Sequence, residues 1–150
     1  MLHKDVTILE KVQRRATKIL PNTKDLQYVD RLKHLDLPTL AYRRVCGDLN
    51  QVYKIVHGLN DISQESLFKF AKQDAGTRGH SYKIQKQHSR LRVREHSFSN
   101  RITNLWNSLP DYVVNAKSMN QFKNGVDDAL SKSLDKFTYG TGQLWQNTIN

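Results

Sequence analysis

The sequence predicts a mainly α-helical fold, a helical bundle of about five to six helices with one small basic β-hairpin. Apolar residues recur at spacings of three and four along most of the chain, and only residues 82–94 alternate with a period of two. The 150 residues, 37% hydrophobic and 25% charged, suit one domain with a core of ordinary size. We expect a single domain over residues 1–137, followed by a flexible polar tail over residues 138–150.

The first predicted helix runs up to Pro21, which ends it. Six apolar residues at helical spacing should line the face that packs on the core: Val6, Leu9, Val12, Ala16, Ile19 and Leu20. The other side carries four basic residues at i, i+3, i+4 and i+7, the basic ridge: Lys11, Arg14, Arg15 and Lys18. This ridge is either a solvated face or a set of phosphate contacts, and the sequence favours neither.

Two more helices follow in the first half of the chain. Thr23 is a plausible N-cap for a short helix that ends near Asp36. Pro38 opens the next helix, and Gly58 stands where a left-handed C-terminal cap is expected. Cys46 falls on the apolar face of that helix, so we expect a buried small side chain rather than a reactive thiol.

The second half of the chain begins with a connector that holds a short helix near Leu67. The predicted hairpin pairs residues 82–85 with residues 90–94 and has one apolar and one basic face. Helical spacing then returns over residues 98–109, with Trp106 expected in the core rather than as a platform for a nucleobase. The Ser118 to Gln121 segment has the form of a capping box and begins the last helix.

Positive charge is concentrated in residues 77–101. This stretch has seven Lys or Arg residues against one acid, Glu95, and so carries +6 of the chain's net +10. Arg90, Arg92 and Arg94 would share one face of a strand. A basic segment of this kind is typical of a protein that binds the phosphates of a nucleic acid, because neutralising phosphates releases counterions. The alternative is a solvated loop that only keeps the protein in solution.

Other features restrict the function classes. A single cysteine excludes an internal disulfide and a cysteine-based zinc site. The first residues lack the apolar core of a signal peptide, and no apolar run approaches the ~20 residues of a membrane span. We therefore expect no membrane partner and a location in the nucleus or cytoplasm.

No catalytic centre stands out in the sequence. Asp127 and Asp128 superficially resemble the paired metal-binding aspartates of polymerases, but they lie within an apolar pattern of helical period. His80, His88 and His96 are eight residues apart, a spacing that matches no common zinc site. The chain also has no glycine-rich phosphate loop. We expect no enzyme activity, no metal and no cofactor.

Several blocks of the chain, in their order, resemble the region after the polymerase core in LINE-type, non-LTR retrotransposon reverse transcriptases, particularly jockey-like elements. They begin with Leu9 to Thr17 and continue through Arg31 to Leu35, Leu37 to Leu40, Tyr42-Arg43-Arg44, Gly47-Asp48-Leu49, Tyr53-Lys54, Thr77 to His80, Ser89-Arg90, Val93-Arg94, Trp106 to Pro110 and Ser118 to Lys123. Each block is weakly specific. Their shared order over roughly residues 5–135 makes the resemblance strong.

This resemblance implies a thumb or post-thumb region, which grips template and primer and does not join nucleotides. The chain contains neither the palm of an RNA-directed DNA polymerase nor an endonuclease, so we expect a remnant reading frame or a fragment reused to bind nucleic acid. The alternative is a helical protein-interaction module whose apolar faces meet a reverse transcriptase core; an autonomous enzyme is a distant third. The candidate phosphate contacts are Lys11, Arg14, Arg15, Lys18, Arg43, Arg44, Arg78, Lys83, Lys86, Arg90, Arg92, Arg94 and Arg101.

Overall fold

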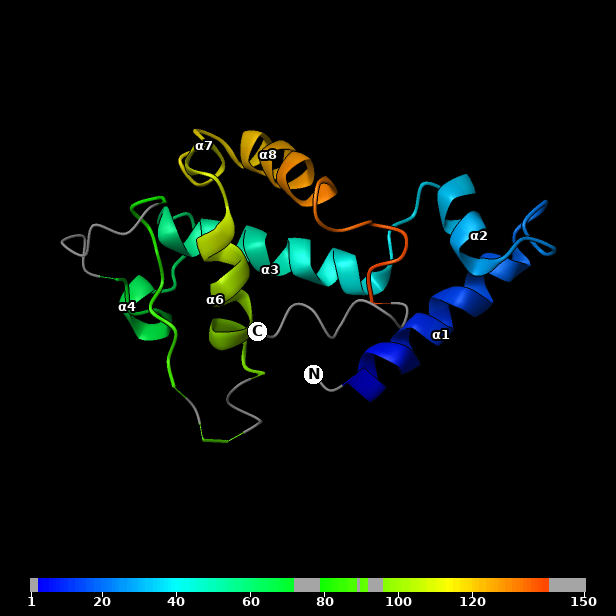
Figure 1. The fold of residues 1–150 in the computed structure, drawn as a ribbon, viewed down its shortest axis with the longest axis horizontal. Helices are drawn as coiled ribbons and strands as arrows, with labels where there is room; N and C mark the ends of the chain where they lie inside the picture. The colour runs from blue at the N-terminus through cyan, green and yellow to red at the C-terminus, as the bar shows by residue number, and fades with distance from the viewer. Residues whose placement is uncertain (1–2, 72–78, 89, 92–95, 141–150) are drawn as a thin grey trace. The chain divides into compact units, whose positions relative to one another are not determined.

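A computed structural model describes residues 3–71, 79–88, 90–91 and 96–140, and within these ranges the only regular elements are helices. They are α1 (His3–Ile19), α2 (Tyr28–His34), α3 (Leu40–Val56), α4 (Gln64–Leu67), α6 (Phe98–Ser108), α7 (Asp111–Val114) and α8 (Met119–Ser131) (Figure 1). The predicted mainly α class is confirmed. The short α7, which follows Pro110, was not predicted, because one helical turn is too short to show a period.

The chain forms two compact units. The first unit comprises Met1–Val45 and Ser131–Asn150, and the second comprises Cys46–Leu130, so α3 contributes its first turns to one unit and its remaining turns to the other. The prediction of one domain over residues 1–137 stays a prediction.

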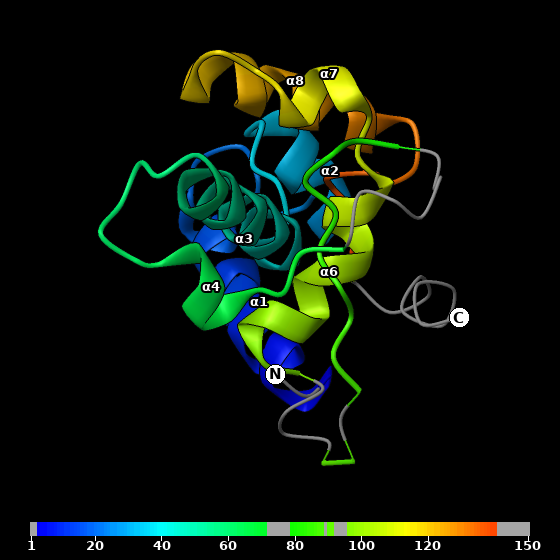
Figure 2. The same cartoon turned by 90° about the vertical axis from the view of Figure 1, so that its left-hand side faces the viewer.

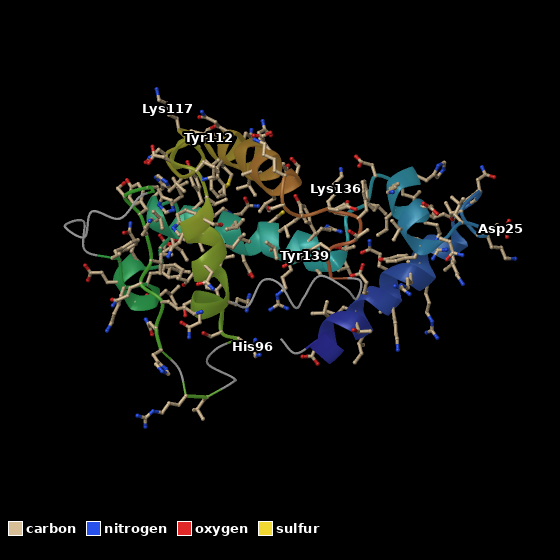
Figure 3. All side chains as sticks on the ribbon, viewed as in Figure 1. Asp25, His96, Tyr112, Lys117, Lys136 and Tyr139 are labelled. Atoms are coloured by element: carbon tan, nitrogen blue, oxygen red, sulfur yellow. The ribbon has the colours of Figure 1, made fainter. Side chains whose placement is uncertain are left out.

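In the first unit, a C-terminal loop packs on the start of α3. The Thr39 N–H donates to the carbonyl oxygen of Lys136 at 2.9 Å, and the Thr39 hydroxyl donates to that of Tyr139 at 2.8 Å. The Tyr139 ring is buried edge-on against Tyr42, with centroids 6.3 Å apart; Figure 3 labels Lys136 and Tyr139 on this loop. The predicted tail therefore does not begin at residue 138, and its residues 141–150 lie outside the described ranges.

Helix α1 packs on its neighbours with a different face from the predicted one. Of the six apolar residues expected in the core only Val6 is buried, whereas Leu9, Val12, Ala16, Ile19 and Leu20 are exposed. The buried positions are Val6, Glu10 and Thr17, with Gln13 half-buried between them. This prediction was wrong because each polar side chain on that face finds a hydrogen-bond partner in the first unit, which offsets the cost of burying it.

The ends of the helices follow local chemistry. The sequence suggested that Thr23 caps α2, and this prediction was wrong. The Thr23 hydroxyl instead lies 2.6 Å from the carbonyl oxygen of Thr17 and 2.8 Å from that of Leu20, so it provides a hydrogen-bond donor for the last carbonyl groups of α1. Gly58 has φ +63° and ends α3 as predicted, with the Leu59 N–H donating to the Lys54 carbonyl at 2.8 Å.

The core of the second unit forms where α6, α7 and α8 meet the later turns of α3. Trp106 and Phe122 are fully buried, as the sequence predicted for Trp106, and the Tyr53 ring stacks on Phe122 with centroids 4.3 Å apart. Figures 1 and 2 both show α7 beside α8. The approach is close: a Cβ at Gly125 would stand 3.1 Å from a methyl group of Val113, so a larger residue would require the Val113 side chain to shift by a few tenths of an ångström.

The predicted hairpin between residues 82–85 and 90–94 is not seen. Ile84 instead forms an antiparallel bridge with Phe70. In this bridge the Ala71 N–H donates to the backbone carbonyl of Lys83 at 2.8 Å, and the Gln85 N–H donates to that of Lys69 at 2.6 Å. Arg90 and Leu91 are described outside any strand, and residues 92–94 lie outside the described ranges.

The side chain of Asn107, on α6, binds the backbone N–H and carbonyl of Ile84, on the side opposite the bridge with Phe70. Its amide oxygen accepts from the Ile84 N–H at 2.9 Å, and its amide nitrogen donates to the Ile84 carbonyl at 2.8 Å. The backbone around Ile84 is therefore bonded on both sides, by the residues that flank Phe70 and by one side chain. This saturation explains why no further strand pairs there.

We predict that Asn107→Ala lowers the free energy of unfolding by about 2 kcal/mol, because it leaves a buried N–H and a buried carbonyl of Ile84 without partners. Asn107→Asp should cost less, since it keeps the acceptor. Asn104→Ala, an exposed amide on the same helix, is the control and should change little. Urea unfolding measures the free energy of unfolding of the three variants. Equal stability of the Asn107→Ala and Asn104→Ala variants would show that the bonds from Asn107 to Ile84 do not stabilise the fold.

Candidate nucleic-acid interface

Helix α1 presents three different faces around its axis. Residues at 100° intervals place Val6, Glu10, Gln13 and Thr17 on one arc, the basic ridge on a second, and the exposed apolar residues on a third. The first arc is the one that packs on the first unit. Both other arcs consequently face solvent, and the orientation of the ridge depends on what holds the first arc in place.

Glu10 is the main anchor of the buried arc. One carboxylate oxygen accepts from the Tyr28 hydroxyl at 2.6 Å, and the other accepts from the Leu40 N–H at 3.1 Å, at the first turn of α3. Burial, assisted by the bond to Glu10, raises the pKa of the Tyr28 hydroxyl well above its usual value, so the phenol keeps its proton. Glu10 thereby connects α1 to both α2 and α3.

Thr17 and Gln13 complete this polar contact. The Arg31 Nε–H donates to the Thr17 hydroxyl at 3.2 Å, and the Gln13 amide donates to the Pro38 carbonyl at 3.0 Å. Arg31 is itself buried and also donates to the Leu26 carbonyl. The sequence did carry a signal for this face, because Val6, Glu10, Gln13 and Thr17 are spaced by four, three and four residues, but three of them are polar.

The four residues of the basic ridge are all exposed. They cover about 10 Å along α1, which spans successive phosphates of one strand. None of the four forms an ion pair within the described ranges. Arg14 differs from the others because its guanidinium lies over the Tyr28 ring, 4.6 Å from the centroid, and this cation–π contact fixes its stem.

The acid that could neutralise the ridge is directed away from it. Glu10 directly precedes Lys11 in the chain, but its carboxylate is buried and both oxygens are hydrogen-bonded, one to Tyr28 and one to Leu40. Three cations of the ridge, Lys11, Arg15 and Lys18, therefore retain most of their positive potential at the surface.

The other candidate contacts are distributed over both units. On α3, Arg43 is exposed and Arg44 is half-buried. In the second unit, Lys86 and Arg90 are exposed and Lys83 is half-buried. Arg78, Arg92 and Arg94 lie outside the described ranges.

Arg101 has a structural partner. Its Nε and Nη2 donate to the two carboxylate oxygens of Asp48, each at 2.8 Å, and Nη1 donates to the His96 carbonyl at 3.3 Å. This paired geometry joins α6 to α3 within the second unit. Arg101 is therefore not part of the proposed phosphate surface.

The histidines of the basic segment have different surroundings. His80 is buried with its ring edge-on to Trp106, and its Nε2 lies 3.0 Å from the Trp106 carbonyl. Burial lowers the pKa of the His80 imidazole, and Nδ1 has no hydrogen-bond partner within the described residues. His80 is thus a neutral core residue, whereas His88 is exposed.

Neither a membrane helix nor a metal cluster is found in the described part of the chain. No described helix is long and apolar enough to cross a bilayer, and no three described His, Cys, Asp or Glu residues are grouped as metal ligands would be. Asp127 and Asp128 lie in α8 and are exposed, as their helical pattern predicts, with the Tyr112 hydroxyl donating to Asp128 at 3.2 Å. Figure 3 labels Tyr112 on α7.

Comparison with known proteins finds no matching family model, no matching curated protein and no matching solved structure. The functional proposal consequently rests on the surfaces of the chain and on its sequence.

We predict that stability falls as the pH falls below about 6.5, because the unfolded chain then binds a proton at His80 that the folded chain does not. The stability contributed by the neutral imidazole is fully present above the unfolded pKa and is lost progressively below it, by at most about 1.4 kcal/mol per pH unit. Urea unfolding at pH 7.5 and 5.5 measures this loss.

His80→Gln keeps a donor near the Trp106 carbonyl but cannot titrate, so its stability should change less between the two pH values. His88→Gln, at an exposed position, is the matched control and should behave as the unchanged protein. The same pH dependence in all three proteins would contradict the assignment to His80.

Proposed function

We propose that this chain is a non-catalytic nucleic-acid-binding module that contacts the phosphate backbone of RNA or DNA through the basic ridge of α1. The observation that carries the proposal is the ridge itself: four exposed cations on one side of one helix, with the nearest acid buried and hydrogen-bonded elsewhere. Such a surface attracts phosphates without reading bases. Lys86 and Arg90 offer further exposed cations in the second unit.

The resemblance to the carboxy-terminal region of a LINE-type reverse transcriptase supports the same function. It would make the bound nucleic acid a template and primer held by their backbone, and it would make the chain a remnant or reused fragment of an RNA-directed DNA polymerase. Such a module would act in the nucleus or cytoplasm, where RNA and DNA are present. The ridge overlaps the first resembling block, Leu9 to Thr17.

We predict that the chain binds duplex DNA without sequence preference. A plot of log affinity against log salt concentration should have a slope of about −4, as for four or five phosphate contacts. Fluorescence anisotropy with two unrelated duplexes, titrated at several salt concentrations, measures the slope. A flat salt titration, or no binding at low salt, would refute the proposal.

A variant of the ridge should weaken this binding and reduce the magnitude of the slope. We propose the triple substitution of Lys11, Arg15 and Lys18 by Gln, leaving Arg14 in place because it packs on Tyr28. The magnitude of the slope should fall by about 0.9 for each phosphate that the variant no longer neutralises. The control replaces three exposed lysines elsewhere by Gln, removing the same charge: Lys54, Lys117 and Lys123.

The basic segment of the second unit provides the competing assignment. If Glu10 and Asp5, which lie near the ridge in the sequence, offset its charge, then replacing Arg90, Arg92 and Arg94 by Gln would weaken binding more than replacing ridge residues. The burial of Glu10 removes part of that reason. We expect the ridge variant to lose at least as much affinity; a larger loss in the arginine variant would move the primary contact to residues 90–94.

Supplied with primer, template, nucleotides and magnesium, the chain should extend nothing. Neighbouring aspartates on a helix diverge by about 100°, so Asp127 and Asp128 do not converge on a shared pair of metal ions. A primer-extension assay tests this. Template-dependent incorporation that Asp128→Ala abolishes would overturn the non-catalytic assignment.

A further inference from the structure

The third arc of α1 is an exposed apolar surface, which we call the apolar stripe: Ile8, Leu9, Val12, Ile19 and Leu20. Exposed fractions reach 84% at Ile19, 62% at Val12 and 59% at Ile8. From Ile8 to Ile19 the stripe follows α1 for about 16.5 Å, or three turns, and Leu20 comes directly after the end of the helix. The large aliphatic side chains form two groups, one from Ile8 to Val12 and one at Ile19 and Leu20, and the exposed Ala16 lies between them on the same arc. An exposed apolar surface of this kind, bordered by polar residues, marks an interaction site.

The core of the first unit does not use this stripe. The arc that packs inward is fixed by Glu10, Gln13 and Thr17, and rotating α1 to bury the stripe would break their bonds to Tyr28, Leu40, Pro38 and Arg31. The stripe is therefore a stable feature of the folded unit.

The margin of the stripe is strongly basic. On a helix, Lys11 and Arg15 fall next to Ile8 and Ile19, so the ridge adjoins one long side of the stripe, while the buried arc adjoins the other. A partner on the stripe would therefore bury aliphatic side chains at its centre and place its own flank against cations. Charge complementarity calls for acids on that flank.

We propose that the apolar stripe is the docking site of an acidic amphipathic helix from a partner protein, whose apolar residues pack on the stripe and whose glutamates or aspartates meet Lys11, Arg15 and Lys18. This is helix-on-helix recognition through anchors at i, i+3, i+4 and i+7. It goes beyond nucleic-acid binding and does not rest on it, because the stripe offers phosphates nothing to bind.

Two other occupants fit less well. A second copy packed antiparallel would bring two basic ridges together, and each copy already carries a net charge of +10. A helix that lies on a lipid surface usually has Trp, Phe or Leu on the inserted face, whereas the stripe has no aromatic side chain and only two leucines, Leu9 and Leu20. Both occupants are outcomes of the test.

The test uses the full chain and a fluorescent synthetic peptide of about 14 residues, long enough to follow the stripe. Its leucines are spaced three and four apart, and its glutamates lie on one flank. A second peptide has lysines in place of the glutamates. The acidic peptide should bind, and the lysine peptide should bind at least roughly tenfold more weakly.

The stripe variant carries Ile8→Gln, Val12→Gln and Ile19→Gln, and its affinity for the acidic peptide should fall at least roughly tenfold. The control variant carries the same change at three exposed aliphatic residues of the second unit: Leu59, Ile62 and Leu91. It should bind the acidic peptide as the unchanged protein does. The stripe variant should retain its helical circular dichroism and its DNA binding, so a loss of peptide binding reports the stripe alone.

Several results would overturn the proposal. Equal effects of the two variants, or equal binding of the two peptides, would show that the stripe or its charged margin is not the site. Unfolding of the stripe variant would show that these side chains stabilise the fold. Stripe-dependent dimerisation in sedimentation experiments would assign the stripe to a second copy, and stripe-dependent binding to phosphatidylcholine–phosphatidylserine vesicles without peptide binding would assign it to lipid. A loss of DNA binding in the ridge variant alone bears only on the proposed function.

Discussion

The carboxylate of Glu10 determines how the first unit presents itself to solvent. It accepts from the Tyr28 hydroxyl on α2 and from the Leu40 N–H at the start of α3, so three helices meet at one side chain. A buried carboxylate is costly unless its oxygens are hydrogen-bonded, and here both are. Because Glu10 must face inward, the rotation of α1 is fixed, and the ridge and the stripe must both face outward.

The same interaction separates opposite charges that are adjacent in the sequence. Glu10 and Lys11 are neighbours in the chain, yet the acid is buried and the base is exposed. Tyr28 serves both sides of this arrangement: its hydroxyl binds Glu10, and its ring supports the guanidinium of Arg14. One aromatic residue of α2 therefore both buries the acid and positions part of the ridge.

All of the described helices except the single-turn α7 could be predicted from the sequence, because spacing, Pro21, Gly58 and the Ser118 capping box are local signals. Ser118 does cap α8, with its hydroxyl accepting from the Gln121 N–H at 3.2 Å. The burial of α1 could not be predicted in this way, since a periodic apolar face identifies a helix but not the neighbour that covers it. The predicted hairpin failed for a related reason: the bonds of Ile84 are decided by Asn107, a side chain 23 residues away.

The cations of the candidate site divide in the same way. The exposure of Lys11, Arg15 and Lys18 could be predicted from their spacing, because exposed cations on a helix need no partner, whereas Arg101 is paired with a carboxylate 53 residues earlier in the chain. Composition thus identifies a basic segment, and only tertiary partners decide which of its charges remain available.

The two exposed arcs of α1 also place a physical constraint on any partner. A polyanion neutralises the ridge but leaves the stripe in water, whereas an acidic helix would cover the stripe and neutralise the ridge at the same time. Since Lys11, Arg15 and Lys18 would serve both ligands, the two cannot engage them fully at once. Binding of an acidic helix on α1 should therefore weaken the hold of the ridge on nucleic acid, and, because linkage is reciprocal, nucleic acid should weaken the binding of the helix by the same factor.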